Sequence, residues 1–158
     1  MTHHPPRMRI LVLGSDRELE ARLWEAGHRV THAREDAREV DMVLIAESTD
    51  TAVFDAVATL PQLRGKILAH TCPGLPPVPA PGVVSVAFSR IHPRADVWAI
   101  AVSDELGATL CELLFRELHY LFVGAEYRDR LAAAYQALLQ VAELPEDVLL
   151  SLVRSIQQ

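Results

Sequence analysis

The chain has 158 residues, of which half are hydrophobic and 23% are charged, as in a globular protein of one domain with a small appendage. The formal net charge of −6 and the lack of a basic stripe in the sequence argue against binding to nucleic acid through phosphate contacts. No apolar run approaches the ~20 residues that span a bilayer, and the first residues lack the apolar core of a secretory signal, so we expect a cytoplasmic protein that does not bind membranes.

The elements expected from residue 8 onward alternate between apolar runs and amphipathic segments. Continuous apolar runs are typical of buried parallel strands, here over residues 8–13, 29–33, 42–46, 66–70, 83–88 and 97–102. Helices are expected after Gly14, after Ser48 or Asp50 through about Leu60, and after Ser103 or Asp104. This alternation predicts an α/β fold over residues 8–124, a Rossmann-like, mostly parallel sheet flanked by helices, behind a flexible tail over residues 1–7.

The helix ends carry their own patterns. Ser15 and Glu18 match a capping box at the start of the first helix, and Gly27 stands where a helix-ending glycine belongs. In the third helix a leucine stripe predicts the buried face, namely Leu106, Leu110, Leu113, Leu114 and Leu118.

A short seventh strand is expected over residues 121–123, and residues 125–158 read as a short helical extension. Two short helices bury little apolar surface by themselves. The extension therefore docks either on the sheet domain of its own chain or on a second subunit, and a homodimer is the expected assembly.

Cysteine and histidine usage predicts neither a disulfide framework nor a metal site. Cys72 and Cys111 are too few for the former, and His3 and His4 lie in a tail without further ligands nearby.

Three stretches resemble known dehydrogenases. They are the strand–Gly–helix opening that ends in Gly27-His28-Arg29-Val30, the segment KILAHTC at 66–72, and Ser89-Arg90-Ile91-His92-Pro93 with the strand and helix that follow. Over roughly residues 8–140 the chain resembles Rossmann-like proteins of the 6-phosphogluconate-dehydrogenase-like superfamily, in the ketopantoate and pyrroline-carboxylate reductase branch with its small actinobacterial members. The resemblance implies NAD or NADP bound by the N-terminal domain, and a helical C-terminal domain that forms a dimer and closes the substrate site. Here that helical part is short.

The dinucleotide fingerprint G-x-G-x-x-G/A is degraded in this chain. Only its first glycine, Gly14, is present, because Asp16 stands at the second position and Leu19 at the third. Asp16 adds a negative charge where a diphosphate would bind, and the carboxylates of Asp16 and Glu18 already offset the positive end of the helix dipole. Two interpretations stay open, ordinary dinucleotide binding at this turn and a purely structural remnant.

Candidate cofactor-binding residues follow the predicted strands. Gly14, Ser15 and Asp16 form the first turn, Glu47 closes the third strand and Thr71 follows the fourth. Arg34 lies 20 residues after Gly14, where an arginine would favour the 2′-phosphate of NADP, although it also fits a solvated turn.

Two histidines are the catalytic candidates, His70 at the end of the fourth strand and His92 after the fifth. In an oxidoreductase, nicotinamide would lie near His70, Thr71 and His92, and one histidine would exchange a proton with a small-molecule substrate. A Cys72–His70 nucleophile pair is a further alternative, without a visible orienting acid. The sequence thus predicts an NAD(P)-dependent oxidoreductase-like protein with weakened or lost cofactor binding. The alternative is a cofactor-free dimeric binding or regulatory module on the same scaffold.

Overall fold

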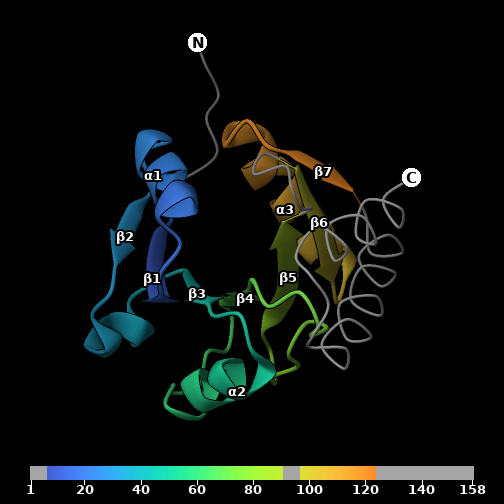
Figure 1. Ribbon diagram of the computed structural model, residues 1–158. Coiled ribbons are helices and arrows are strands. Elements are labelled where there is room, and N and C mark those ends of the chain that lie inside the picture. The colour runs from blue at the N-terminus through green and yellow to red at the C-terminus, as the bar shows by residue number, and fades with distance from the viewer. Residues whose placement is uncertain (1–6, 91–96, 124–158) are drawn as a thin grey trace, which may run out of the picture.

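A seven-stranded sheet forms the centre of the computed structural model, which describes residues 7–90 and 97–123 (Figure 1). The strands lie in the order β2-β1-β3-β4-β5-β6-β7. Their bounds are β1 (Arg9–Gly14), β2 (Arg29–Thr31), β3 (Met42–Ala46), β4 (Ile67–His70), β5 (Val84–Arg90), β6 (Val97–Val102) and β7 (Leu121–Val123). The α/β, mostly parallel sheet expected from the sequence is confirmed.

One pair of neighbouring strands runs antiparallel. β5 and β6 pair antiparallel, with Arg90 opposite Trp98, whereas every other pair in the sheet is parallel. A parallel pair needs a crossover of about a dozen residues or more, and the six residues of sequence between these strands are too few. After the next helix, residues 118–120 contact the helix that follows β1, and these contacts belong to the site described below.

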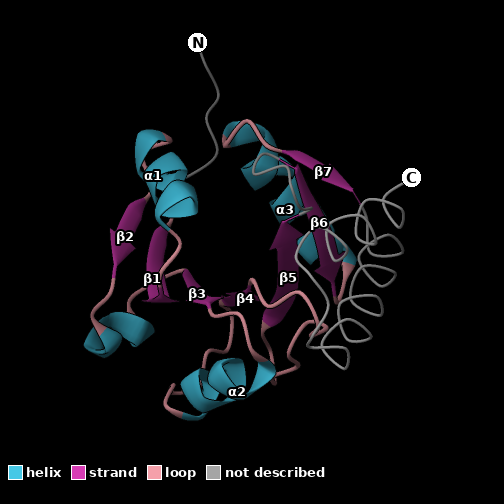
Figure 2. Ribbon diagram, in the orientation of Figure 1, coloured by secondary structure: helices cyan, strands magenta, loops and turns pink. Residues whose placement is uncertain are grey.

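Helices cover both faces of the sheet (Figure 2). α1 (Arg17–Glu25) and α3 (Glu105–Glu117) pack on one face, and α2 (Asp50–Ala58) packs on the other with the 3-10 helix η1 (Arg34–Arg38). Each face has its own apolar cluster, since strand side chains alternate between the two sides.

The start of α1 differs from the expected capping box. Asp16, not Ser15, is the N-cap: its Oδ1 accepts a hydrogen bond from the Leu19 N–H at 3.1 Å. Glu20, not Glu18, closes the cap, because its Oε2 accepts from the Asp16 N–H at 2.9 Å. β1 extends through Gly14, so the helix begins later, and a carboxylate at its start is stabilised by the helix dipole.

The other helix ends confirm some expectations and correct others. α2 is capped by Thr49, whose Oγ1 accepts from the Ala52 N–H at 3.2 Å, so neither Ser48 nor Asp50 is the cap. α3 is capped by Asp104, one of the two expected residues, which accepts from the Gly107 N–H at 2.8 Å. The helix end at Gly27 is confirmed by its φ of 92°.

The predicted leucine stripe of α3 is confirmed in part, since Leu114 and Leu118 are buried and Leu110 packs against the core. Leu106 and Leu113 are 58% and 48% exposed, whereas Cys111 and Phe115 are buried. Phe115 contacts Phe88, Trp98 and Tyr120, with ring centroids 4.9–5.8 Å apart. The area buried by this aromatic ring, more than any one leucine, sets which side of the helix faces the sheet.

Three expectations fall outside the described residues: most of the tail over residues 1–7, His92, and the extension over residues 125–158. Among the residues the structure describes, no helix has the length and apolarity needed to cross a membrane. The same residues contain no group of three or more His, Cys, Asp or Glu side chains placed to hold a metal ion.

Candidate functional site

A cleft of about 610 Å³ opens at the carboxyl edge of the parallel strands. β1 lies between β2 and β3, so the chain leaves β1 toward one side of the sheet and later crosses to the other. In open α/β sheets this switch point is where ligands bind. The cleft is lined by residues from the ends of β1, β3, β4 and β5, and from β6, namely Gly14, Ser15, Asp16, Ala46, Glu47, Ser48, Thr71, Pro73, Arg90 and Trp98.

Gly14 shapes the turn into the cleft. Its φ is 88°, and a Cβ at this position would lie 2.4 Å from the main-chain oxygen of Ala46 on the neighbouring strand. A side chain is therefore excluded both by the backbone conformation and by the close approach of β3. The fold by itself therefore requires a glycine at the first position of the fingerprint, whether or not a ligand binds.

Asp16 and Arg90 form a two-point ion pair over the start of α1. Arg90 Nη2 lies 2.8 Å from Asp16 Oδ1, and Arg90 Nη1 contacts Asp16 Oδ2. Both side chains are largely covered, at 13% exposure for Asp16 and 31% for Arg90. The Asp16 carboxylate thus takes the place at the helix N-terminus that a ligand phosphate would use.

Arg90 is held from two further directions. Its guanidinium carbon lies 4.4 Å above the Trp98 ring centroid, and Nη2 lies 3.0 Å from Glu18 Oε2. Burial by itself would lower the pKa of Arg90, but its hydrogen bonds to Asp16 and Glu18 and the charge of Asp16 raise the pKa above its ordinary value. Arg90 was not among the predicted site residues, although it follows a predicted strand whose end lies at the same edge of the sheet.

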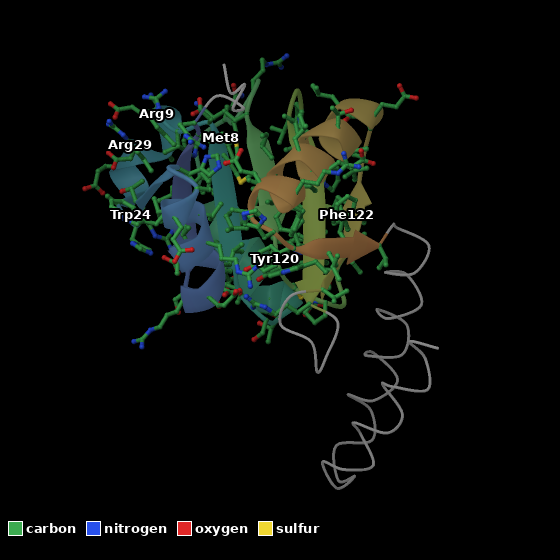
Figure 3. All side chains as sticks on the ribbon, turned by 90° about the horizontal axis from the view of Figure 1, so that it is seen from above. Met8, Arg9, Trp24, Arg29, Tyr120 and Phe122 are labelled. Carbon is green, nitrogen blue, oxygen red and sulfur yellow. The ribbon has the colours of Figure 1, made fainter. Side chains whose placement is uncertain are left out.

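Glu18 joins α1 to the end of α3. Tyr120, which is labelled in Figure 3, donates its hydroxyl hydrogen to Glu18 Oε2. Arg22 Nε lies 2.6 Å from Glu18 Oε1. Arg22 also lies 4.2 Å from the Tyr120 ring centroid and donates to the Leu118 main-chain oxygen at 3.0 Å. Burial, then the hydrogen bond to Glu18 and its charge, raise the pKa of Tyr120. These contacts fix the first two turns of α1 against the segment after α3.

His70 lies next to the cleft but is buried, with 2% of its surface exposed. Its Nδ1 accepts from the Cys72 main-chain N–H at 3.1 Å, and its Nε2 lies 2.9 Å from the Pro76 oxygen. Since Nδ1 accepts, Nε2 carries the proton and donates, which defines the neutral tautomer. The Cys72 sulfur lies 3.6 Å from the Ser48 oxygen. His70 thereby holds the segment at residues 73–82, which contains five prolines, against the end of β4.

The other predicted cofactor residues separate into two groups. Ser15, Glu47 and Thr71 line the cleft with Gly14 and Asp16. Arg34 is exposed at the start of η1, donates to the Thr59 hydroxyl after α2, and does not line the cleft. The structure therefore brings together five of the six, and Arg34 lies apart.

Comparisons with known proteins identify solved structures of similar fold. No family model matches the chain, and no curated protein sequence matches it. A solved candidate NADP oxidoreductase from Bacteroides fragilis is 19% identical, with a TM-score of 0.57 over 94% of this chain and 78% of that one. A candidate F420-dependent NADP reductase from an Arthrobacter species is 14% identical, with a TM-score of 0.60 over 85% of this chain and 93% of that one.

An imine reductase from Myxococcus stipitatus, solved with NADP+, is 15% identical, with a TM-score of 0.59 over 85% of this chain. This chain spans 61% of that reductase. At these identities the likeness establishes the fold and not the activity. The chain therefore has a Rossmann-like fold, similar to that of these solved oxidoreductases.

Proposed function

We propose that this protein is a Rossmann domain of the NAD(P)-dependent oxidoreductase type whose affinity for a nicotinamide dinucleotide is limited by Asp16. The proposal is carried by the cleft at the β1–β3 switch point, which opens on the Gly14 turn and the start of α1. The similar structures support it, because one of them was solved with NADP+. The volume of about 610 Å³ lies within the range of small-molecule sites.

The residues present fit a dinucleotide only in part. The turn after Gly14 and the polar side chains of Ser15 and Thr71 suit a ligand that lies across the strand ends. The Asp16 carboxylate does not suit a diphosphate, because two like charges at the same helix N-terminus repel each other. A dinucleotide would enter only after Asp16 and Arg90 separate, and the free energy needed to separate them lowers the observed affinity.

The test is a titration of the wild-type protein and of D16G with NADPH and NADH, in which binding is measured by calorimetry and by nucleotide fluorescence. We expect weak binding by the wild type and at least about a tenfold gain in D16G, because the substitution removes the like charge. D104G is the matched control: it removes an aspartate N-cap from α3 in the same way, but Asp104 does not line the cleft. The proposal fails if folded D16G binds no more tightly than the wild type.

A second candidate is a cofactor-free binding or regulatory module, and the Asp16–Arg90 ion pair favours it. In this case the wild-type protein gives no binding signal with NADPH or NADH at high concentration. A gain of NADPH binding in D16G would then identify the Asp16 carboxylate as the obstruction. Cytoplasmic location, a homodimer, an NADP preference through Arg34, and proton exchange by His70 or His92 with a small-molecule substrate stay predictions.

A further inference from the structure

We propose that Arg90 is the residue that binds the diphosphate of the ligand in this cleft, and that the Asp16 carboxylate holds that place until the ligand displaces it. The proposal rests on the function proposed above and adds a recognition residue to it. In the protein without ligand, the Asp16 carboxylate thus occupies the anion site to which Arg90 contributes.

The first support is the donor set around the Asp16 carboxylate. Its Oδ1 accepts from the Leu19 main-chain N–H at 3.1 Å and from Arg90 Nη2 at 2.8 Å. A helix N–H group and a two-point guanidinium contact are the donors that proteins use for phosphate oxygens. They converge here on one carboxylate that faces the cleft.

The second support is that Arg90 does not depend on Asp16 for its position. The guanidinium stacks on Trp98 with its carbon 4.4 Å from the ring centroid, and it is hydrogen-bonded to Glu18 at 3.0 Å. If the Asp16 side chain is removed, we therefore expect Arg90 to stay at the mouth of the cleft, with Nη1 released from its present carboxylate partner.

The third support comes from Trp98 itself, which lines the cleft and is fully buried. Its indole N–H has no hydrogen-bond partner among the described residues. Buried donors are rarely left in this state. Trp98, a lining residue of the cleft, thus carries a buried donor that the described residues leave unused.

A simpler reading is that Arg90 only neutralises Asp16. The two readings separate when Asp16 is already absent, because Arg90 then has only Glu18 left to neutralise, while a phosphate contact keeps its full effect. The decisive comparison is therefore R90M made in the D16G background, and not in the wild type.

The experiment measures binding of NADPH and of inorganic pyrophosphate by calorimetry to D16G and to D16G/R90M. We expect R90M to weaken both by about tenfold to a hundredfold, the effect of losing hydrogen bonds to a charged group. D16G/R64M is the matched control, since Arg64 precedes β4 at the opposite edge of the sheet and the charge change is equal. It should bind both ligands as D16G does.

The outcomes separate the two proposals. Equal affinities of D16G and D16G/R90M overturn the role of Arg90, whatever NADPH does. Pyrophosphate binding that depends on Arg90, without NADPH binding, supports the role of Arg90 and rules out the proposed nicotinamide dinucleotide as the ligand. If D16G binds neither ligand, both proposals fail. If D16G does not fold, D16N replaces it throughout, because asparagine keeps the helix cap and removes the charge.

Discussion

Asp16 and Arg90 meet over the first turn of α1 although 74 residues separate them in the sequence. The pair connects the first βα turn to the end of β5 and thereby closes one side of the cleft. An aspartate at this position looks unfavourable when the local motif is considered alone. With its distant partner it becomes a stabilised group, because its charge is balanced and its oxygens are hydrogen-bonded.

Substituting methionine for Arg90 should destabilise the fold by about 1–3 kcal/mol, because Asp16 and Glu18 lose a largely covered cation while the apolar stem over Trp98 is kept. Urea unfolding at neutral pH measures the loss. The D16N/R90M protein should be more stable than the two single losses predict, since each single variant leaves a charge unpaired or a partner unused. Strictly additive losses would show that the two side chains do not stabilise each other.

Substituting alanine for Gly14 tests the close approach of β1 and β3. We expect a loss of about 3 kcal/mol or more, because the left-handed conformation is strained and the new Cβ meets the Ala46 oxygen. G65A is the matched control: Gly65 has a φ of 81°, but its Cβ would meet nothing within 4 Å, so only the conformational cost of about 1–2 kcal/mol applies. Equal losses in thermal unfolding would argue against a steric role for Gly14.

The strands were predictable because their information is local. β3, β6 and β7 span the residues that the apolar runs indicated, and Gly27 ends α1 as its position predicted. A buried parallel strand needs a continuous apolar run, and a helix end needs a residue that tolerates positive φ. Both requirements are visible within a few residues of sequence.

The site was predictable only as a location. Gly14, Glu47 and Thr71 line the cleft because the ends of parallel strands share one edge. The roles of Arg90 and Tyr120 were missed, since Tyr120 bonds a glutamate 102 residues away and no periodic pattern records such a pair. The α1 cap was missed for a related reason: Glu18, the expected capping partner, is bound instead by Arg22, Arg90 and Tyr120.

Replacing His70 separates a structural from a catalytic histidine. H70A should lose about 2–4 kcal/mol, because it removes two hydrogen bonds to the main chain and leaves a cavity. H70Q keeps one donor and one acceptor, so it should lose less than H70A in urea unfolding. If an oxidoreductase activity is found, H70Q should retain most of it. A folded H70Q protein with abolished turnover and unchanged cofactor affinity would instead support the proton-transfer role.

Cys111 should make the fold less stable in alkali. Burial, and then the negative charge of Glu112, raise the pKa of the Cys111 thiol from 9.0 to about 12. Below pH 9 both the folded and the unfolded chain keep the thiol proton, so the contribution to stability is fully present. As the pH rises from 9 toward 12, the unfolded chain releases this proton and the folded chain does not, so the free energy of unfolding falls by a few kcal/mol.

Tyr120, whose pKa burial also raises, lowers the free energy of unfolding in the same pH range. Comparing the wild type with C111A in the same buffers cancels this contribution. C111A should start less stable, because a buried side chain is shortened, and should then lose stability more slowly with pH. A constant difference between the two proteins across this range would mean that the buried thiol ionises as easily in the folded chain as in the unfolded one.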